Sequence, residues 1–317
     1  MTDSQATRPP RLPRRDVHGV LLLDKPLGLS SNDALVRAKR LLRALKAGHT
    51  GTLDPLATGL LPLCFGEATK FSQDLLDADK TYEAVVRLGQ TTTTGDAEGE
   101  VLVERAVQCD RAAVEAAMTR FTGTIEQVPP MYSALKKDGR PLYAYARAGQ
   151  TVERAARTVT IHALSLLALS LDAGVTPALT MRVTCSKGTY IRTLAEDIGE
   201  ALGCGAHLTA LRRTAVGDLT LAGAVTLEQI EAQPDEARPT LLAPVDALLQ
   251  RCAPVQLDDA ATARFLQGQR IARRDLPVDT VLDEGVLARV YGGVPARLLG
   301  VARMREGALR PERLVRL

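Results

Sequence analysis

The sequence predicts an α+β protein that consists of a large mixed body and a small β-rich C-terminal module. Segments typical of strands and of helices are mixed without the regular alternation of a doubly wound sheet. The chain has 317 residues, of which 45% are apolar, enough to bury one large core and a small second one. The run EAQPDEARPTLLAP is rich in proline and charge and indicates a boundary near residue 250. We therefore expect a body over residues 17–250 and a module over residues 251–317.

The N-terminal part of the chain is expected to hold a tail, a strand and a basic helix. Residues 1–16 are polar, basic and proline-rich, which is typical of a disordered tail rather than a signal peptide. The apolar run GVLLLDKP then predicts a short buried strand that ends in a turn. The next segment, SSNDALVRAKRLLRALKAG, predicts a helix that Ser31 or Asn32 caps and Gly48 ends. Its expected apolar face consists of Leu35, Ala38, Leu42 and Leu45.

The middle of the body is expected to hold further strands and helices in irregular order. Alternation of apolar and polar residues predicts strands in KTYEAVVRLGQTT and RTVTIHALSLLALSL. The segment ALTMRVTCSKGTYIRTLAEDIGEALG predicts a strand, a tight turn at Gly188 and a helix, and RAAVEAAMTRFTG predicts another helix. Beyond residue 250, short apolar segments separated by glycine and proline predict the β-rich module.

Composition argues against several classes of protein. The 40 lysines and arginines nearly balance the 37 aspartates and glutamates, so a nucleic-acid surface would have to come from local clustering. The five cysteines are widely spaced and form no C-x-x-C pair, which indicates reduced thiols rather than disulfides or a zinc site. No segment approaches the ~20 apolar residues of a membrane-spanning helix. We expect a cytoplasmic protein without a bound metal.

One carboxylate, Asp54, stands isolated in the segment AGHTGTLDPLATGLLPL. Pro55 restricts the residue before it to extended geometry, so Asp54 is expected on a turn or extended backbone. Gly48, Gly51 and Gly59 leave room for another molecule to approach the backbone. The chain has no phosphate-binding glycine loop, no nearby second carboxylate and no nucleophile elbow. Asp54 therefore either stabilises its own turn or acts as a nucleophile or base without a cofactor.

Four motifs resemble those of one enzyme family, in the same order, across roughly residues 17–225. GHTGTLDPLATGLLPLCFGEATK is similar to the family's catalytic segment, and KTYEAVVRLGQTTTTGDAEG to its K-x-Y strand and T-x-T-x-D turn. QVPPMYSALKKDGRPLYAYARAG resembles its Q-x-P-P-x-Y-S-A-x-K insertion. CSKGTYIRTLAEDIGEALGCGAHLTALRRTAVG resembles its C-S-x-G-T-Y-I-R strand and L-R-R-T turn. The family is that of the bacterial TruB pseudouridine synthases, and GALRPERLVRL resembles, more weakly, the end of its PUA-like domain.

This resemblance implies a fold, a reaction and a small set of reacting groups. The implied fold is that of pseudouridine synthases, a central mixed, mostly antiparallel sheet flanked by helices, with a small PUA-like C-terminal domain. The implied reaction converts uridine-55 in the TΨC arm of tRNA to pseudouridine. The uracil leaves its stack, detaches from ribose, turns and rejoins through carbon, so the atoms balance without a cofactor. By resemblance Asp54 is the catalytic residue, Arg192 pairs with it, and Tyr82 lies against the target base.

Further residues match positions of the family's RNA-binding site. Tyr190 and Leu211 match residues that line the pocket, although core packing is a competing role for Leu211. His49 matches a histidine that lies against the opened RNA loop, and Asp96 matches an acid that orders the site or assists product release. Three lysines at motif positions are expected either to contact RNA or to be solvated at the rim: Lys25, Lys70 and Lys80.

The resemblance also implies tRNA as the partner, in a monomer without an obligate protein partner. The groove for RNA is expected to combine the basic helix face over residues 37–46, the insertion's KKDGR, and Arg212 with Arg213. The insertion, roughly residues 124–151, is expected to be a mobile clamp over the RNA or else a disordered loop. Three alternatives stay open: an RNA-binding or tRNA-folding module without chemistry, a guide-RNA-dependent relative, and an unrelated cofactorless isomerase or hydrolase.

Overall fold

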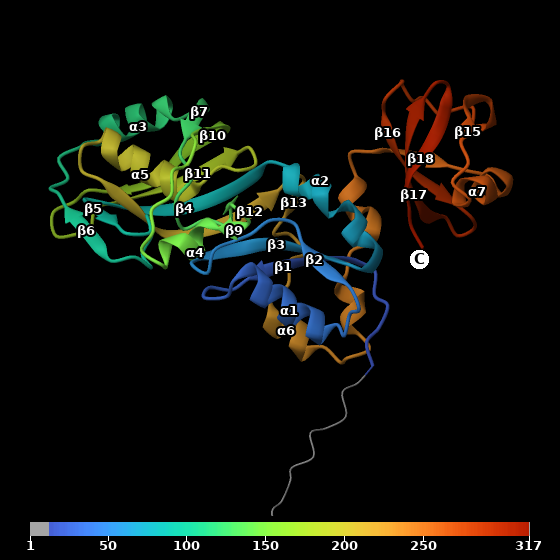
Figure 1. Cartoon of the computed structure of the whole chain (residues 1–317), viewed down its shortest axis with the longest axis horizontal. Helices are drawn as coiled ribbons and strands as arrows, with labels where there is room; N and C mark the ends of the chain where they lie inside the picture. Colours follow the sequence, from blue (N-terminus) through green and yellow to red (C-terminus); the bar gives the residue numbers. More distant parts are fainter. Residues whose placement is uncertain (1–12, 317) are drawn as a thin grey trace, which may run out of the picture.

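A computed structural model describes residues 13–316 and has the predicted α+β architecture (Figure 1). Seven strands of its large sheet follow the order β1-β3-β12-β4-β11-β10-β7, with β2 and β13 attached to β3 and β12. All pairings in this sheet are antiparallel except β12 with β3, so the sheet is mixed and mostly antiparallel, as expected. The strands are β1 (Gly19–Lys25), β2 (Ala47–His49), β3 (Ala57–Phe65), β4 (Lys80–Leu88), β7 (Gly123–Gln127), β10 (Arg157–Ser170), β11 (Ala178–Cys185), β12 (Ala206–Val216) and β13 (Leu219–Thr220).

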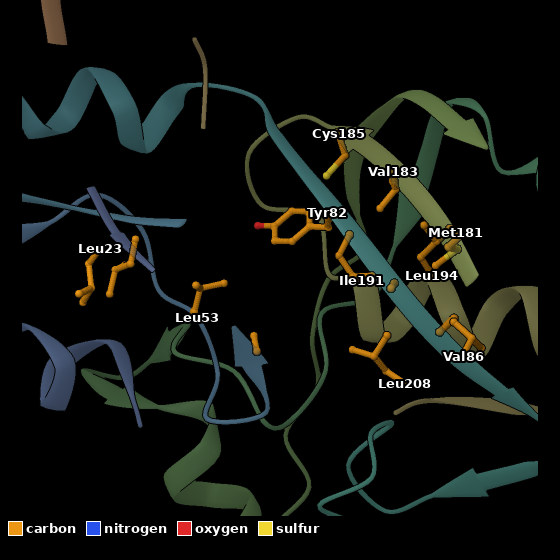
Figure 2. Packing of buried hydrophobic residues seen from close by; sticks show 14 of the residues in the cluster. Leu23, Leu53, Tyr82, Val86, Met181, Val183, Cys185, Ile191, Leu194 and Leu208 are labelled. Carbon is orange, nitrogen blue, oxygen red and sulfur yellow. The ribbon is translucent and has the colours of Figure 1, made fainter. Parts of the chain in front are cut away.

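Helices cover parts of this sheet, and most of the core lies between them and the strands. Figure 1 shows α3 and α5 near one end of the sheet, and α1 and α6 side by side below β1 and β3. Figure 2 shows Val86 of β4, Met181 of β11 and Leu194 of α5 within one buried cluster. The helices of the body are α1 (Ser31–Leu41), α2 (Ser72–Asp77), α3 (Arg111–Arg120), α4 (Leu142–Ala146), α5 (Ile191–Ala201) and α6 (Leu227–Ala232), with 3-10 turns η1 (Gly66–Phe71), η2 (Arg238–Leu241) and η3 (Val245–Leu249).

The basic helix α1 begins and ends earlier than the sequence predicts. Ser30, rather than Ser31 or Asn32, is the N-cap, because its hydroxyl accepts a hydrogen bond from the Asp33 amide. The helix ends at Leu41, well before Gly48, because Arg43 takes a left-handed φ of 53°. The expected apolar face is therefore wrong at its far end, where Leu45 is exposed.

The C-terminal part forms a second sheet, with β14 paired in parallel to β16 and the other strands antiparallel. A cluster of apolar residues is internal to it, and a second cluster joins Leu298 and Val301 to Val20 and Phe71 of the body. The Tyr291 hydroxyl also lies 2.5 Å from the Asp246 carboxylate. Its elements are β14 (Ala253–Gln256), α7 (Asp259–Leu266), β15 (Ile271–Ala272), η4 (Arg273–Asp275), β16 (Leu287–Gly292), β17 (Arg297–Arg305) and β18 (Ala308–Leu314).

Two segments that the sequence leaves without structure are held in the fold. The expected tail lies outside the described residues over 1–12, but Arg15 pairs with Asp235 and forms a bridge with Ala44. Residues 124–151 are not a disordered loop, since they begin in β7 and continue through small elements of their own. These small elements are the hairpin of β8 (Lys136–Lys137) and β9 (Arg140–Pro141), followed by α4; a second hairpin, of β5 (Gln90–Thr92) and β6 (Val101–Glu104), lies elsewhere.

Candidate active site

Asp54 lies on the non-helical loop between β2 and β3, as the proline after it predicts. The residue before it, Leu53, is fixed by Ser31 at the start of α1. The Ser31 hydroxyl accepts a hydrogen bond from the Leu53 amide at 2.7 Å and donates to the Leu53 carbonyl at 3.1 Å. With the loop held in this way, the Asp54 side chain keeps 45% of its surface exposed. Asp54 therefore presents a positioned and accessible carboxylate.

Arg192, in the first turn of α5, forms an ion pair with this carboxylate. Its side chain is only 7% exposed, and its Nη2 donates to Asp54 Oδ2 at 2.8 Å and to the Tyr132 carbonyl at 2.6 Å. Its Nη1 donates to the Thr94 carbonyl at 3.0 Å and lies 3.4 Å from Asp96 Oδ2. One guanidinium thus joins the Asp54 loop, the turn that carries Asp96, and the 124–151 segment. Because its donors are fixed by several acceptors, the guanidinium is oriented before any substrate arrives.

A cavity of about 450 Å³, here called the Asp54 pocket, opens beside this ion pair. Tyr82, Tyr190 and Leu211 line it together with Asp54 and Arg192, so five of the predicted site residues meet here. Figure 2 shows the Tyr82 ring extending from β4 toward the side where Leu53 lies. Burial raises the pKa of both phenols, so both stay neutral at ordinary pH. Neutral aromatic faces beside one carboxylate suit a flat, uncharged ring.

Gln127, which the sequence reasoning passed over, positions one wall of the pocket. This buried side chain at the end of β7 accepts a hydrogen bond from the Tyr190 amide at 3.1 Å and donates to the Tyr190 carbonyl at 3.3 Å. The Gln127 side-chain amide therefore pairs with the backbone of Tyr190, at the start of α5, in the way that a neighbouring strand would. The sequence signal for this role is the position of Gln127 as the first residue of the motif QVPPMYSALKK.

Three other predicted site residues lie outside the wall of the Asp54 pocket. Asp96 is buried behind Arg192, and its Oδ1 accepts from the Thr94 hydroxyl at 2.5 Å and from the Glu98 amide at 3.1 Å. His49 is half-buried on β2, and burial lowers the pKa of its imidazole. Lys70, on η1, donates to Glu67 at 2.6 Å and to the Leu314 carbonyl of β18 at 2.9 Å, so it joins the body to the C-terminal sheet.

Several cations expected at the RNA surface are instead internal. Lys25 and Lys80 are buried and donate to backbone carbonyls, so solvation at a rim is wrong for both. Arg213 is also buried, with Nε on the Leu60 carbonyl at 2.8 Å, and lines the Asp54 pocket rather than the outer surface. Arg212 makes a two-pronged ion pair with Asp24 at 3.0 and 2.7 Å.

Gly59 serves the fold rather than a ligand. A Cβ at this position, where φ is +96°, would lie 2.3 Å from the Arg213 carbonyl oxygen of β12. The close approach that the sequence suggested for another molecule is therefore made by the neighbouring strand.

Burial of Lys25 predicts a measurable pH dependence of stability. Burial lowers the pKa of Lys25 from 10.5 to about 8. Between these values the unfolded chain binds the extra proton, so the wild-type free energy of unfolding should rise with pH relative to Lys25→Met. The rise has an upper limit of about 3 kcal/mol. Urea unfolding of both proteins between pH 7.5 and 10 measures it.

Lys80 provides a second test of the same effect, because burial also lowers the pKa of this lysine to about 8. The free energy of unfolding of the wild type, minus that of Lys80→Met, should rise over the same pH range. Differences that stay constant in both pairs would contradict the buried, titrating lysines.

Residues 13–316 contain no cluster of three or more histidine, cysteine or acidic side chains that could hold a metal ion. All five cysteines are free thiols. None of the described helices is both long and apolar enough to cross a membrane.

Comparisons with known proteins cover the whole chain. Family models match as "TruB family pseudouridylate synthase (N terminal domain)" over residues 39–191, "tRNA pseudouridylate synthase B C-terminal domain" over 192–250, and "Pseudouridine synthase II TruB, C-terminal" over 253–315. Proteins named tRNA pseudouridine synthase B from Cupriavidus metallidurans and Ralstonia pickettii are 83% and 66% identical, with 100% of each chain covered.

Solved structures agree with these matches. The chain resembles one in the archaeal box H/ACA sRNP Nop10–Cbf5 complex, with a TM-score of 0.68 and 25% identity over 94% of this chain and 86% of that one. A chain of a Cbf5–Nop10–Gar1 complex gives a TM-score of 0.67 and 26% identity, over 94% of this chain and 84% of that one. The sequence motifs, the fold and these matches agree, and the chain belongs to the TruB family of pseudouridine synthases.

Proposed function

We propose that this protein converts uridine-55 in the TΨC arm of tRNA to pseudouridine, with Asp54 as the catalytic residue. The observation that carries the proposal is the Asp54–Arg192 ion pair at 2.8 Å. Its Asp54 side chain is 45% exposed and lines the Asp54 pocket. Relatives of 66–83% identity over the full chain bear the name tRNA pseudouridine synthase B. The isomerisation breaks and forms bonds within one nucleotide, which suits a single carboxylate that needs no oxidant or metal.

The pocket supports a division of roles. The extruded uracil would lie against Tyr82, between Tyr190 and Leu211, where aromatic stacking can return ~1–3 kcal/mol of the cost of unstacking. Arg192 would hold the carboxylate in one orientation as the base detaches and rejoins. Asp96, buried behind Arg192, would hold the guanidinium in turn. His49 and Lys70 remain candidates for contact with parts of the RNA outside the pocket.

RNA beyond the target nucleotide would be held by charge. Lys39 and Arg40 line a cavity of about 930 Å³ at the far end of α1, and neither makes an ion pair with a described residue. Lys136 and Lys137 of the β8–β9 hairpin add exposed positive charge, and we expect the 124–151 segment, part of which lines the Asp54 pocket, to act as a clamp over the RNA. We assign the C-terminal residues 251–317 to RNA binding as a PUA-like domain and place the enzyme, as a monomer, in the cytoplasm with its substrate.

A direct test is to incubate the purified protein with an unmodified tRNA transcript and map pseudouridine by carbodiimide treatment and primer extension. The proposal expects one stop, at the uridine of the TΨC loop. Product at another position would assign the chain another target. Binding without product would favour the RNA-binding or tRNA-folding module, and activity only with an added guide RNA would favour the guide-dependent alternative.

Affinity for tRNA should fall steeply with salt, because phosphate contacts release counterions. We expect the logarithm of the dissociation constant to rise linearly with the logarithm of the salt concentration between about 50 and 200 mM. The Lys39→Ala/Arg40→Ala double variant should make this slope shallower by about 2. Fluorescence anisotropy with labelled tRNA measures it.

Arg111→Ala provides a single-charge control for this measurement, because Arg111 is an exposed cation that lies on α3, where it pairs with Glu115. This variant should keep the wild-type slope. A slope that is flat in the wild type, or unchanged in the double variant, would remove α1 from the RNA surface.

A further inference from the structure

Glu196 of α5 is a half-buried carboxylate that has no part in the chemistry proposed above. It follows Arg192 by about one helical turn, so the two side chains share one face of the helix. Side chains on a helix lean toward its N-terminus, which directs Glu196 toward the level of Arg192. Both side chains reach the turn that carries Asp96.

The Glu196 carboxylate lies against Gly95, the middle residue of this turn, here called the 94–96 turn. A Cβ on Gly95, where φ is +71°, would lie 2.9 Å from both Cδ and Oε1 of Glu196 and 3.0 Å from Oε2. Real Cβ atoms do not approach other atoms this closely, so the carboxylate occupies the space of the missing side chain. On the two flanks of Gly95, the Thr94 carbonyl accepts from Arg192 at 3.0 Å and Asp96 Oδ2 lies 3.4 Å from it.

The contacts with α5 determine how far the 94–96 turn lies from Arg192. Backbone hydrogen bonds tie the turn to β12, since the Leu208 amide donates to the Gly95 carbonyl at 3.0 Å and the Ala97 amide donates to the Leu208 carbonyl at 2.9 Å. These bonds fix the turn along the strand but do not join it to the helix. Arg192 attracts the turn through hydrogen bonds, and Glu196 fills the space beside Gly95. The turn is therefore held between two side chains of one helix.

The size of Glu196, rather than its charge, suits this position. The carboxylate makes no hydrogen bond or ion pair with a residue in the described range 13–316. Burial, followed by the charge of Asp197, raises the pKa of the Glu196 carboxyl, so the surroundings disfavour its ionised form. The charged groups that face it are Arg192, Asp197 and Glu200 on α5, and Asp96 on the turn.

We propose that Glu196 is a positioning residue for the isomerisation: its side chain fills the space beside Gly95 and so keeps Asp96 against Arg192, which in turn orients Asp54. This inference rests on the proposed function, since Asp54 must be the reacting group. The effect on rate can be large although Glu196 does not touch the substrate. A shift of about 1 Å in a reacting group, caused from a distance, can cost about 10²-fold in rate.

The test compares Glu196→Ala with Glu196→Gln in single-turnover assays on an unmodified tRNA transcript. The alanine variant leaves the space empty, so its rate should fall by about 10–100-fold, while its dissociation constant for tRNA stays within a few-fold of wild type. The glutamine variant has the length of glutamate and should keep most of the wild-type rate. Glu200→Ala is the matched control, since Glu200 lies on the next turn of α5, is 57% exposed and pairs with Arg105. This control should keep the wild-type rate.

Gly95→Ala tests the contact from the other side. Its methyl group would displace the Glu196 carboxylate, so this variant should also be slow. In the Glu196→Ala background the methyl group enters an empty space, and the same substitution should cost much less rate. The strain of an alanine at positive φ is present in both backgrounds and therefore cancels in the comparison. Losses of rate that simply multiply would show that the two residues do not act together.

The outcomes separate the positioning role from the proposed function. A full rate in Glu196→Ala, a glutamine variant as slow as the alanine variant, or equal losses of rate and tRNA affinity would overturn the positioning role and leave the proposed function intact. Thermal unfolding of each variant identifies any loss of rate that comes from unfolding at the assay temperature. A wild-type protein that forms no pseudouridine in tRNA would overturn both.

Discussion

Asp54→Asn should abolish pseudouridine formation, with a fall in kcat of roughly 10⁴-fold or more. The amide has the size of the carboxylate and can still accept a hydrogen bond from Arg192, but it is neither a nucleophile nor a base. Single-turnover assays with an unmodified tRNA transcript, read by carbodiimide and primer extension, measure the loss.

The same variant should fold and bind almost normally. Asp54 is 45% exposed, and Arg192 keeps Asp96 and two backbone carbonyls as partners. We therefore expect a change in unfolding free energy of about 1 kcal/mol or less, and a dissociation constant for tRNA within a few-fold of wild type. Isomerisation that survives in Asp54→Asn would show that another group is the catalyst.

Arg192→Ala should lower kcat by about 10²–10³, with a much smaller effect on tRNA affinity. The guanidinium is 7% exposed beneath Asp54, where it contacts protein acceptors and lines the pocket floor. Its removal frees the carboxylate to rotate, and disturbs the reacting geometry more than the RNA-binding surface. Stopped-flow binding and single-turnover rates on the same tRNA separate the two quantities.

The stability of Arg192→Ala has to be measured together with its rate and affinity, because the variant leaves the buried Asp96 without its cation. The expected cost is about 3 kcal/mol, which thermal unfolding detects. Arg192→Lys keeps the charge but not the fork of donors, so it should be more stable than the alanine variant and still slow. Equal losses of rate and affinity in the lysine variant would contradict the orienting role.

Local sequence signals determined several strands and helices, but not β3 or β12, where the expected L-R-R-T turn is part of a strand. The apolar run before Lys25, the alternating segment of β4, and the strand, Gly188 turn and helix up to Ala201 all form as predicted. Pro55 determined the non-helical backbone at Asp54. These signals succeed because backbone restriction and hydrophobic periodicity act between neighbours in the chain.

Charge patterns were less reliable, since one charged residue looks the same in a sequence whether it is solvated or buried. Lys25, Lys80 and Arg213 were expected at a wet surface, but each lies inside and donates to backbone carbonyls. The end of α1 was missed for a related reason, since a left-handed arginine has no strong signature. Burial depends on which distant parts of the chain pack against a residue.

By itself, then, the sequence determined the α+β class, several of the strands and helices and, through its motifs, the family and the group of residues to examine. Only the tertiary structure decided how they meet. Asp54 and Arg192 are 138 positions apart, and their 2.8 Å contact depends on the pairing of β12 with β3 and β4 and on the packing of α5 against β12. Such contacts are set by strand register and core packing over the whole body, which no local pattern encodes.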